Sequence, residues 1–220
     1  MEGIEIHTGV LPQWVFVVFL LIFSVLALMR ASFPNRFTEF LKLPVNNRFV
    51  VIYEKKEKKI HIFTFISLVL QWISLSLLVY VWLLFYHVKL PFITGVDFLD
   101  LALLLLGFLG LKYFFQKNLI HLFDLRYFGK SYIYNRIIYS SYASFLTVIL
   151  LFLVVYVQIL NAYSFNFLFF ILLIINLLSW FTFIKTNQLK IKPYLIYFIL
   201  YLCTFEIAPY VFLMYGLEFV

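Results

Sequence analysis

One acidic residue lies deep inside an apolar stretch of this sequence, where it could carry chemistry. Glu206 falls about 12 residues into the run 194–216 and three residues before Pro209. Proline has no backbone N–H and so frees a carbonyl beside the glutamate, which favours a small polar cavity. Because no intramembrane Lys or Arg is expected to pair with it, Glu206 is expected to be protonated much of the time. It either titrates during a transport step or stays neutral and holds helices or a partner subunit together.

Polar side chains in other apolar stretches reach a similar depth. Gln71 lies inside 62–86 and Asn176 inside 165–184. Asp100 opens a third stretch, and helix N-termini favour acidic residues, so capping is the simpler role for this residue. The sequence predicts an intramembrane polar site formed by Glu206, Asn176, Gln71 and Asp100.

Small polar residues also recur at helical spacing on two of the stretches. One stripe is formed by Ser67, Gln71 and Ser74, and a second by Ser140, Ser144 and Thr147. Residues three and four apart share a helix face, and polar faces inside a bilayer pack against other helices. Both stripes are therefore expected to face the interior of a bundle.

A second group of chemically capable residues lies between two apolar stretches. His121 and Asp124 are three residues apart, a spacing that would let them share a metal ion or a proton, but no third ligand is near. Cys203 is the only cysteine, and no nucleotide-binding, nucleophile-elbow or zinc-protease motif occurs. We predict no catalytic set, no metal and no cofactor, with a candidate cytoplasmic interface site at Asn118, His121, Asp124 and Arg126.

The composition identifies the elements that must position these residues. Of 220 residues, 65% are hydrophobic and 12% are charged, against about 45–50% and about 25% in soluble domains. A water-soluble protein of this size could not bury so much apolar surface, so disordered, secreted and soluble classes are excluded. We predict an all-α membrane protein with a single integral membrane domain over 1–220. Six transmembrane helices are expected at about 11–29, 62–86, 96–115, 137–160, 165–184 and 194–216.

The basic residues predict how this bundle is oriented. All of the 17 Lys and Arg except Lys89 fall in or beside the odd-numbered links, which include the basic links 30–61 and 116–136. The positive-inside rule places these links in the cytoplasm and both termini outside. The links also carry amphipathic patterns, such as Phe37, Phe40 and Leu41, that predict short interfacial helices. Anionic lipid headgroups are the expected partners of this face, and nucleic acid is not.

Two segments carry a resemblance to a known family. The run YFILYLCTFEIAPYVF (Tyr197–Phe212) and the link KNLIHLFDLRYFGKSYIYNRIIYSSY (Lys117–Tyr142) resemble small polytopic inner-membrane proteins of Bacteroidetes-type Gram-negative bacteria. That family is defined only as a domain of unknown function. The resemblance extends over most of the chain after about residue 50. It implies a bacterial inner-membrane, multi-pass location and gives weight to Glu206, Asn118, His121 and Asp124, but it implies no activity.

Three functions are compatible with these features. The first is a non-enzymatic subunit or scaffold of a larger envelope assembly for transport, secretion or motility, with other membrane subunits as partners. The second is a small proton-coupled transporter that uses Glu206. The third, which the sequence favours least, is a membrane enzyme that acts on lipid-linked substrates through His121, Asp124 and Arg126.

Overall fold

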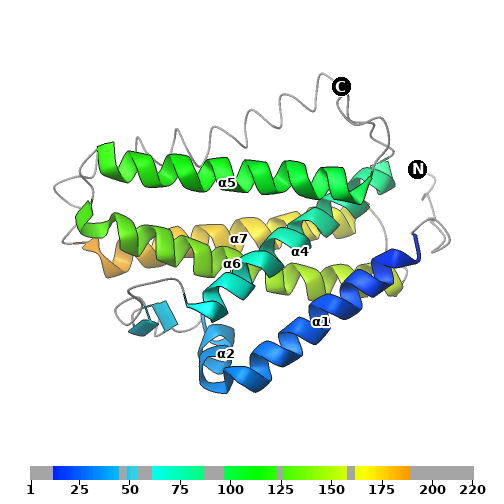
Figure 1. Cartoon of the computed structure of the whole chain (residues 1–220), viewed down its shortest axis with the longest axis horizontal. Helices are drawn as coiled ribbons and strands as arrows, with labels where there is room; N and C mark the ends of the chain where they lie inside the picture. The colour runs from blue at the N-terminus through cyan, green and yellow to red at the C-terminus, as the bar shows by residue number, and fades with distance from the viewer. Residues whose placement is uncertain are drawn as a thin grey trace.

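The fold consists of α-helices throughout the part of the chain that is described. The structure is a computed structural model, and it describes residues 12–44, 49–50, 52–53, 61–86, 97–122, 126–157 and 162–188, without the side chains of 119–122, 126–128, 130 and 162. The helices in these ranges are α1 (Trp14–Ser32), α2 (Pro34–Leu41), α4 (Ile62–Tyr86), α5 (Phe98–Leu122), α6 (Arg126–Tyr156) and α7 (Ala162–Thr186). Figure 1 shows α5, α6 and α7 lying lengthwise, with α4 crossing them obliquely.

Five of the predicted spans form helices that are long and apolar enough to cross a bilayer. These are Trp14–Ser32, Ile62–Tyr86, Phe98–Asn118, Ser131–Tyr156 and Tyr163–Thr186. A helix of about 20 residues rises about 30 Å, the thickness of the hydrocarbon core. The predicted bounds 62–86 agree with α4, and 11–29 is displaced to Trp14–Ser32. The sixth predicted span, 194–216, lies outside the described residues, so the count of six and the orientation stay predictions.

The predicted link 116–136 is mostly helix that continues from the spans. Helix α5 extends to Leu122 and α6 begins at Arg126. This corrects the expectation of a link containing a short helix that lies on the membrane. The physical reason is that 116–136 contains no proline and a single glycine, Gly129, so both helices propagate beyond their apolar segments.

The short helix predicted in the link 30–61 is present as α2, but it packs differently from the expectation. Helix α1 stops at Phe33, which has φ −133° and ψ 57°, because the residue before Pro34 is disfavoured in the α conformation. The apolar face of α2 is buried against the bundle rather than free to lie on lipid. Phe40 is 4% exposed, with its ring centroid 5.8 Å from that of Phe63 and 5.5 Å from that of Tyr142.

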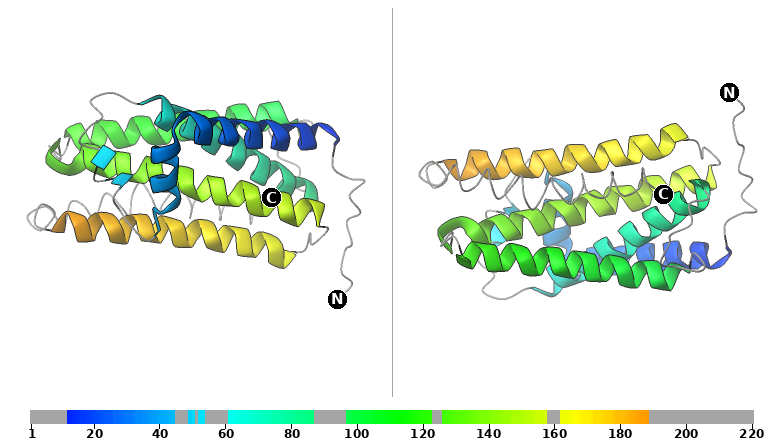
Figure 2. Two further views of the ribbon diagram at one scale, coloured as in Figure 1. Left: turned by 90° about the horizontal axis from the view of Figure 1, so that it is seen from below. Right: turned by 90° about the horizontal axis from the view of Figure 1, so that it is seen from above.

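Helices α4 and α6 form the centre of the bundle. Half of each of these spans is buried, compared with 22% of the spans in α1 and α7 and 11% of the span in α5. Figure 2 shows α6 between α7 on one side and α4 and α5 on the other. The apolar core includes Phe19, Leu77, Leu151 and Phe165, all fully buried. The polar residues carried by α4 and α6 are therefore held in the best-packed part of the described structure.

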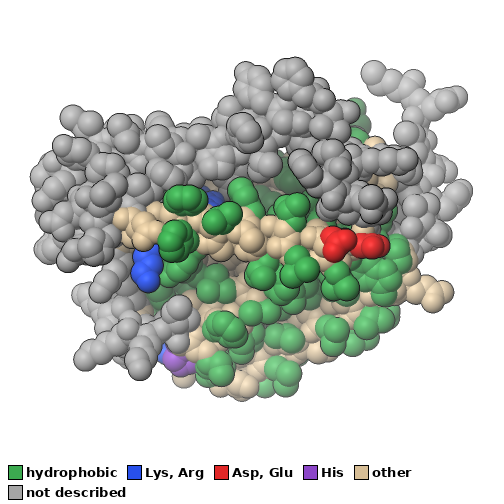
Figure 3. Space-filling view, turned by 45° about the horizontal axis from the view of Figure 1, so that its top comes forward, with side chains coloured by type: hydrophobic (Ala, Val, Ile, Leu, Met, Phe, Trp, Pro, Cys, Tyr) green, Lys and Arg blue, Asp and Glu red, His purple; other side chains and the backbone are tan. Residues whose placement is uncertain are grey.

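The outer faces of the helices are apolar, as contact with lipid requires. Leu103 on α5, Phe170 on α7 and Leu21 on α1 are each more than half exposed. Figure 3 shows hydrophobic side chains over one such face, with acidic side chains toward one end and basic ones toward the other. Asp97, which directly precedes α5, and Lys117, near the end of α5, are separated by about 30 Å of chain at helical rise. This spacing matches the thickness of a hydrocarbon core.

Candidate functional site

Gln71 connects α4 to α6 through both atoms of its amide group. Its Nε2 donates to Ser140 Oγ at 2.6 Å, and Ser141 Oγ donates to its Oε1 at 3.3 Å. Gln71 is 7% exposed, so an unpaired amide at this position would be costly. The expectation that the polar stripes face other helices is confirmed here for Gln71 and Ser140, whereas the use of Ser141 was not predicted.

The other hydroxyl side chains of the two polar stripes bond mainly to their own helices. Ser67 Oγ donates to the Phe63 carbonyl at 2.9 Å, and Thr147 Oγ1 donates to the Ala143 carbonyl at 2.8 Å. Such i−4 bonds satisfy a hydroxyl inside a helix and leave its oxygen able to accept. Ser144 Oγ is buried and makes no hydrogen bond with the described residues. The seam between α4 and α6 is therefore polar but almost fully satisfied internally.

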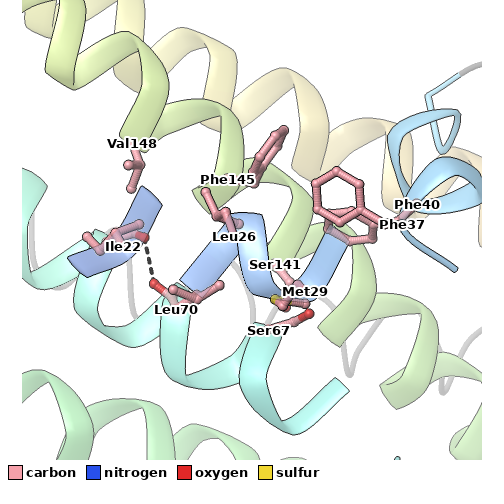
Figure 4. A pocket seen from close by; sticks show the side chains of 11 residues that line it. Ile22, Leu26, Met29, Phe37, Phe40, Ser67, Leu70, Ser141, Phe145 and Val148 are labelled. Atoms are coloured by element: carbon pink, nitrogen blue, oxygen red, sulfur yellow. Dashed lines mark hydrogen bonds between the residues drawn. The ribbon is translucent and has the colours of Figure 1, made fainter. Parts of the chain in front are cut away.

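A small cavity adjoins this seam where α1, α2, α4 and α6 meet. Ser67, Ser74 and Ser141 form its polar wall, and apolar side chains such as Met29 and Phe40 form the rest. Figure 4 shows these side chains around the space and the hydrogen bond from the Ser74 hydroxyl to the Leu70 carbonyl. The volume is about 20 Å³, close to what a single water molecule needs. No substrate of metabolite size fits in this cavity.

The second polar contact joins α6 to α7 around a buried arginine. Arg136 is 7% exposed, and its Nη1 donates to the backbone carbonyl of Asn176 at 3.3 Å. Its guanidinium carbon lies 5.2 Å from the ring centroid of Trp180, within the range of a cation–π contact. Asn135 Nδ2 donates to the carbonyl of Ser179 at 3.1 Å. Within the described part of the chain, Arg136 is the one charged side chain that is buried.

Sequence reasoning missed Arg136, which was assigned to a link because it immediately precedes the predicted span 137–160. The premise that no Lys or Arg lies within the bundle is therefore wrong. A signal was present, because the stripe Ser140, Ser144 and Thr147 extends back by four residues to Arg136. Mean hydropathy does not reveal this stripe, because a single arginine ends an apolar segment of the sequence even where the helix continues.

The predicted intramembrane site is described for three of its four members. Asn176 is half-buried, and its Nδ2 donates to the Leu172 carbonyl of its own helix at 2.8 Å. Gln71 bonds to α6 and shares no hydrogen bond with Asn176 among the described contacts. Asp100 is exposed in the first turn of α5. Glu206 lies outside the described residues, so the four-residue site remains a prediction.

The predicted cytoplasmic interface site is described only at its edge. Asn118 is exposed near the end of α5, while His121 lies in the last turn of α5 and Arg126 begins α6, both without described side chains. Asp124 lies outside the described residues. No group of three His, Cys, Asp or Glu that could hold a metal ion occurs in the described ranges. The site is thus neither formed nor excluded by the structure.

Comparison with known proteins gives a family. Residues 15–217 match the domain of unknown function DUF4271. No curated protein and no solved structure shows significant similarity to the chain. Because the match spans nearly all of the 220 residues, and agrees with the resemblance noted in the sequence, the chain belongs to the DUF4271 family.

Proposed function

We propose that this protein is a non-enzymatic, multi-pass subunit or scaffold of a larger assembly in the inner membrane of a Gram-negative bacterium. The observation that carries the proposal is a pair of exposed glycines on the outer face of α5. Gly107 and Gly110 are exposed there, and a Cβ added to either would have no atom within 4 Å. Glycine in a helix costs about 1 kcal/mol relative to alanine. Packing among the described residues does not account for that cost, whereas close approach of a helix from another chain does.

The interior of the bundle supports the same proposal. The cavity where α1, α2, α4 and α6 meet holds about one water molecule, and the polar groups around Gln71 bond to one another. A carrier needs a binding site for its substrate, and an enzyme needs a pocket with convergent reactive groups. The described residues also border a larger hollow of about 380 Å³ beside Phe16, Phe23 and Phe152, but it is open and almost wholly apolar, so it offers neither kind of site. A scaffold whose described interior has no substrate-sized polar cavity can act through its apolar outer faces alone.

The partners follow from the chemistry of these faces. Other membrane subunits are expected along α5, and anionic lipid headgroups at the end of the bundle that carries Arg30 and Lys185. In this proposal that end is cytoplasmic and both termini are outside, with transport, secretion or motility as the role of the assembly. Nucleic acid is not an expected partner.

The test is affinity purification of the tagged full chain from its native membrane in mild detergent, followed by mass spectrometry. We expect a stoichiometric membrane partner that Gly107→Phe removes. The matched control is Leu177→Phe, because Leu177 is a 47% exposed residue on the outer face of α7. Recovery of the wild-type chain alone, or equal loss of the partner in both variants, would contradict the proposal.

A second candidate is a small proton-coupled transporter that uses Glu206. The buried Arg136 favours it, because charged residues inside a bundle often mark ion and proton pathways. This candidate predicts that Glu206→Gln inserts and folds normally but abolishes transport. A Glu206→Gln variant with full transport activity would exclude this candidate and leave the subunit proposal intact.

A further inference from the structure

A hollow on the outer side of the bundle lies between α1 and α6. Its volume is about 380 Å³, and its walls are formed by Phe16, Leu20, Phe23, Ser24, Ala27 and Phe152. All of these residues except Phe152 belong to α1, and Phe152 belongs to α6. Phe16 and Leu20 are each about half exposed, so the hollow opens outward. We refer to this hollow as the α1–α6 groove.

Aromatic rings hold the walls of the α1–α6 groove in place. The ring of Phe152 packs edge to face against Phe23 at 5.2 Å between centroids, and it lies 5.4 Å from the ring of the fully buried Phe19. Edge-to-face packing of this kind fixes the orientation of both rings. The Ser24 hydroxyl donates to the Leu20 carbonyl at 2.8 Å, so its own helix satisfies it. The groove is therefore preformed and suited to an apolar occupant.

The face of α1 that lines the groove ends in a positive charge. Phe16, Leu20, Phe23 and Ala27 follow one another at helical spacing, and Arg30 continues the same row three residues after Ala27. Arg30 is exposed in the last turn of α1. The groove thus leads along one helix face to a guanidinium.

The charge of the chain changes sharply at this end of the groove. Residues 12–29 contain no charged side chain, whereas 30–44 contain Arg30, Arg36 and Lys42 against a single acid, Glu39. A basic segment that follows an apolar helix attracts anionic lipid headgroups. An occupant of the groove is therefore expected to be apolar along its length and negative at the Arg30 end.

The dimensions of the groove fit one acyl chain of a lipid whose headgroup lies at Arg30. Arg30 follows Leu20 by ten residues, which corresponds to about 15 Å of helix. One leaflet is half of a hydrocarbon core about 30 Å thick, and so is also about 15 Å deep. At about 30 Å³ for each water-sized group, the groove has room for about a dozen methylene groups.

A helix from another chain fits the α1–α6 groove less well than a lipid does. Close contact between helices in a membrane needs small residues, such as Gly107 and Gly110 on α5. The α1–α6 groove is bordered instead by the rings of Phe16, Phe23 and Phe152, which keep a second backbone at a distance. A flexible hydrocarbon chain is thin enough to lie between these rings.

We propose that the α1–α6 groove binds one anionic phospholipid, with an acyl chain beside Phe23 and Phe152 and the phosphate paired with Arg30. Packing of the chain against the rings supplies affinity. The guanidinium supplies selectivity for anionic headgroups, because it donates charge-assisted hydrogen bonds to phosphate oxygens. The inference rests on the proposed membrane location but not on the partner proposed along α5.

The test is native mass spectrometry of the purified full chain in mild detergent, titrated with phosphatidylglycerol or with phosphatidylcholine of the same acyl chains. We expect the first phosphatidylglycerol to bind about fivefold more tightly than the first phosphatidylcholine, because one arginine near a headgroup favours an anionic lipid by about that factor. Arg30→Gln should abolish this preference. The matched control is Lys185→Gln, which removes an exposed charge from the last turn of α7 and should preserve the preference. Equal affinity of the wild-type chain for both lipids would overturn the proposal.

A second pair of variants tests the groove itself. Ala27→Phe places a ring in the space of the acyl chain and should weaken binding of either lipid by about tenfold or more. The matched control is Leu28→Phe, because Leu28 is an exposed neighbour on α1 that does not line the groove, and its affinity should stay within about twofold. If Ala27→Phe yields no monodisperse size-exclusion peak, Ser24→Leu fills the same groove and replaces it. Equal affinities of the filled variant and Leu28→Phe would overturn the site, as would a protein dimer that the filled variant dissociates.

The lipid site and the subunit contact on α5 fail separately in these experiments. Gly107→Phe should remove the subunit partner and leave the lipid affinity unchanged, because Gly107 does not line the groove. Ala27→Phe should remove the lipid and leave the subunit partner in place. Loss of lipid binding in both variants would overturn the assignment of the lipid to this groove.

Discussion

The packing of α2 gives the sharpest prediction, because the sequence and the structure lead to opposite results. Phe40 is 4% exposed, and its ring lies within 6.3 Å, between centroids, of the rings of Phe49, Phe63, Tyr142 and Phe145. Replacing a buried phenylalanine with alanine costs about 3–5 kcal/mol. Edge-to-face packing of the Phe40 ring against these four neighbours favours the upper part of that range.

The expected effect of Phe40→Ala is a large loss of thermal stability. In a chain of this size 1 kcal/mol corresponds to about 2–4 °C, so the midpoint should fall by about 10 °C. The measurement is the thermal loss of the monodisperse size-exclusion peak of the purified full chain. The matched control is Leu41→Ala on the same helix, which removes a 42% exposed side chain and should change the midpoint by less than about 3 °C.

An interfacial α2 would behave differently. If Phe40 lay in lipid, as the amphipathic pattern predicts, Phe40→Ala would weaken binding to vesicles and leave the midpoint in detergent nearly unchanged. Equal and small shifts for Phe40→Ala and Leu41→Ala would refute the argument that α2 is part of the folded core. The experiment therefore tests a tertiary contact that hydrophobic patterning cannot reveal.

Three further predictions concern single residues. A double-mutant cycle of Gln71→Leu and Ser140→Ala should give a coupling free energy of about 0.6 kcal/mol, the average for hydrogen bonds between helices inside membranes. If the two changes are additive, the 2.6 Å bond contributes nothing to stability. Trp72→Phe should lower the thermal midpoint by about 3 °C, because Trp72 Nε1 donates to the Ala102 carbonyl at 2.7 Å and thereby joins α4 to α5. Gly107→Ala should raise the midpoint of the isolated chain by about 2–4 °C, because the added methyl group meets no atom of the described residues and improves helix propensity. A fall would show that this position is strained.

Some elements of the fold could be predicted from the sequence and others could not. The predicted span 62–86 coincides with α4, and the break between α1 and α2 follows from Pro34. The residues 116–136 were misjudged because basic residues lower the hydropathy of a segment without ending its helix. Arg136 was missed for the same reason. Gln71 was recognised as a residue that faces the bundle, whereas its partners, about 70 residues away in the sequence, were not identified.

The sequence by itself determines the class of this protein, the approximate positions of its apolar helices and some of the polar residues that face the bundle, such as Gln71. These properties follow from length, apolarity and proline, which act locally. Only the tertiary structure decides that Gln71 meets Ser140 and Ser141, that Arg136 is enclosed against α7, and that α2 packs on the bundle. The physical reason is that apolar residues cover most faces of the long helices, so hydrophobic periodicity alone does not indicate which face packs against which neighbour. A few hydrogen bonds, ring contacts and small residues make that choice, and they act between segments far apart in the chain.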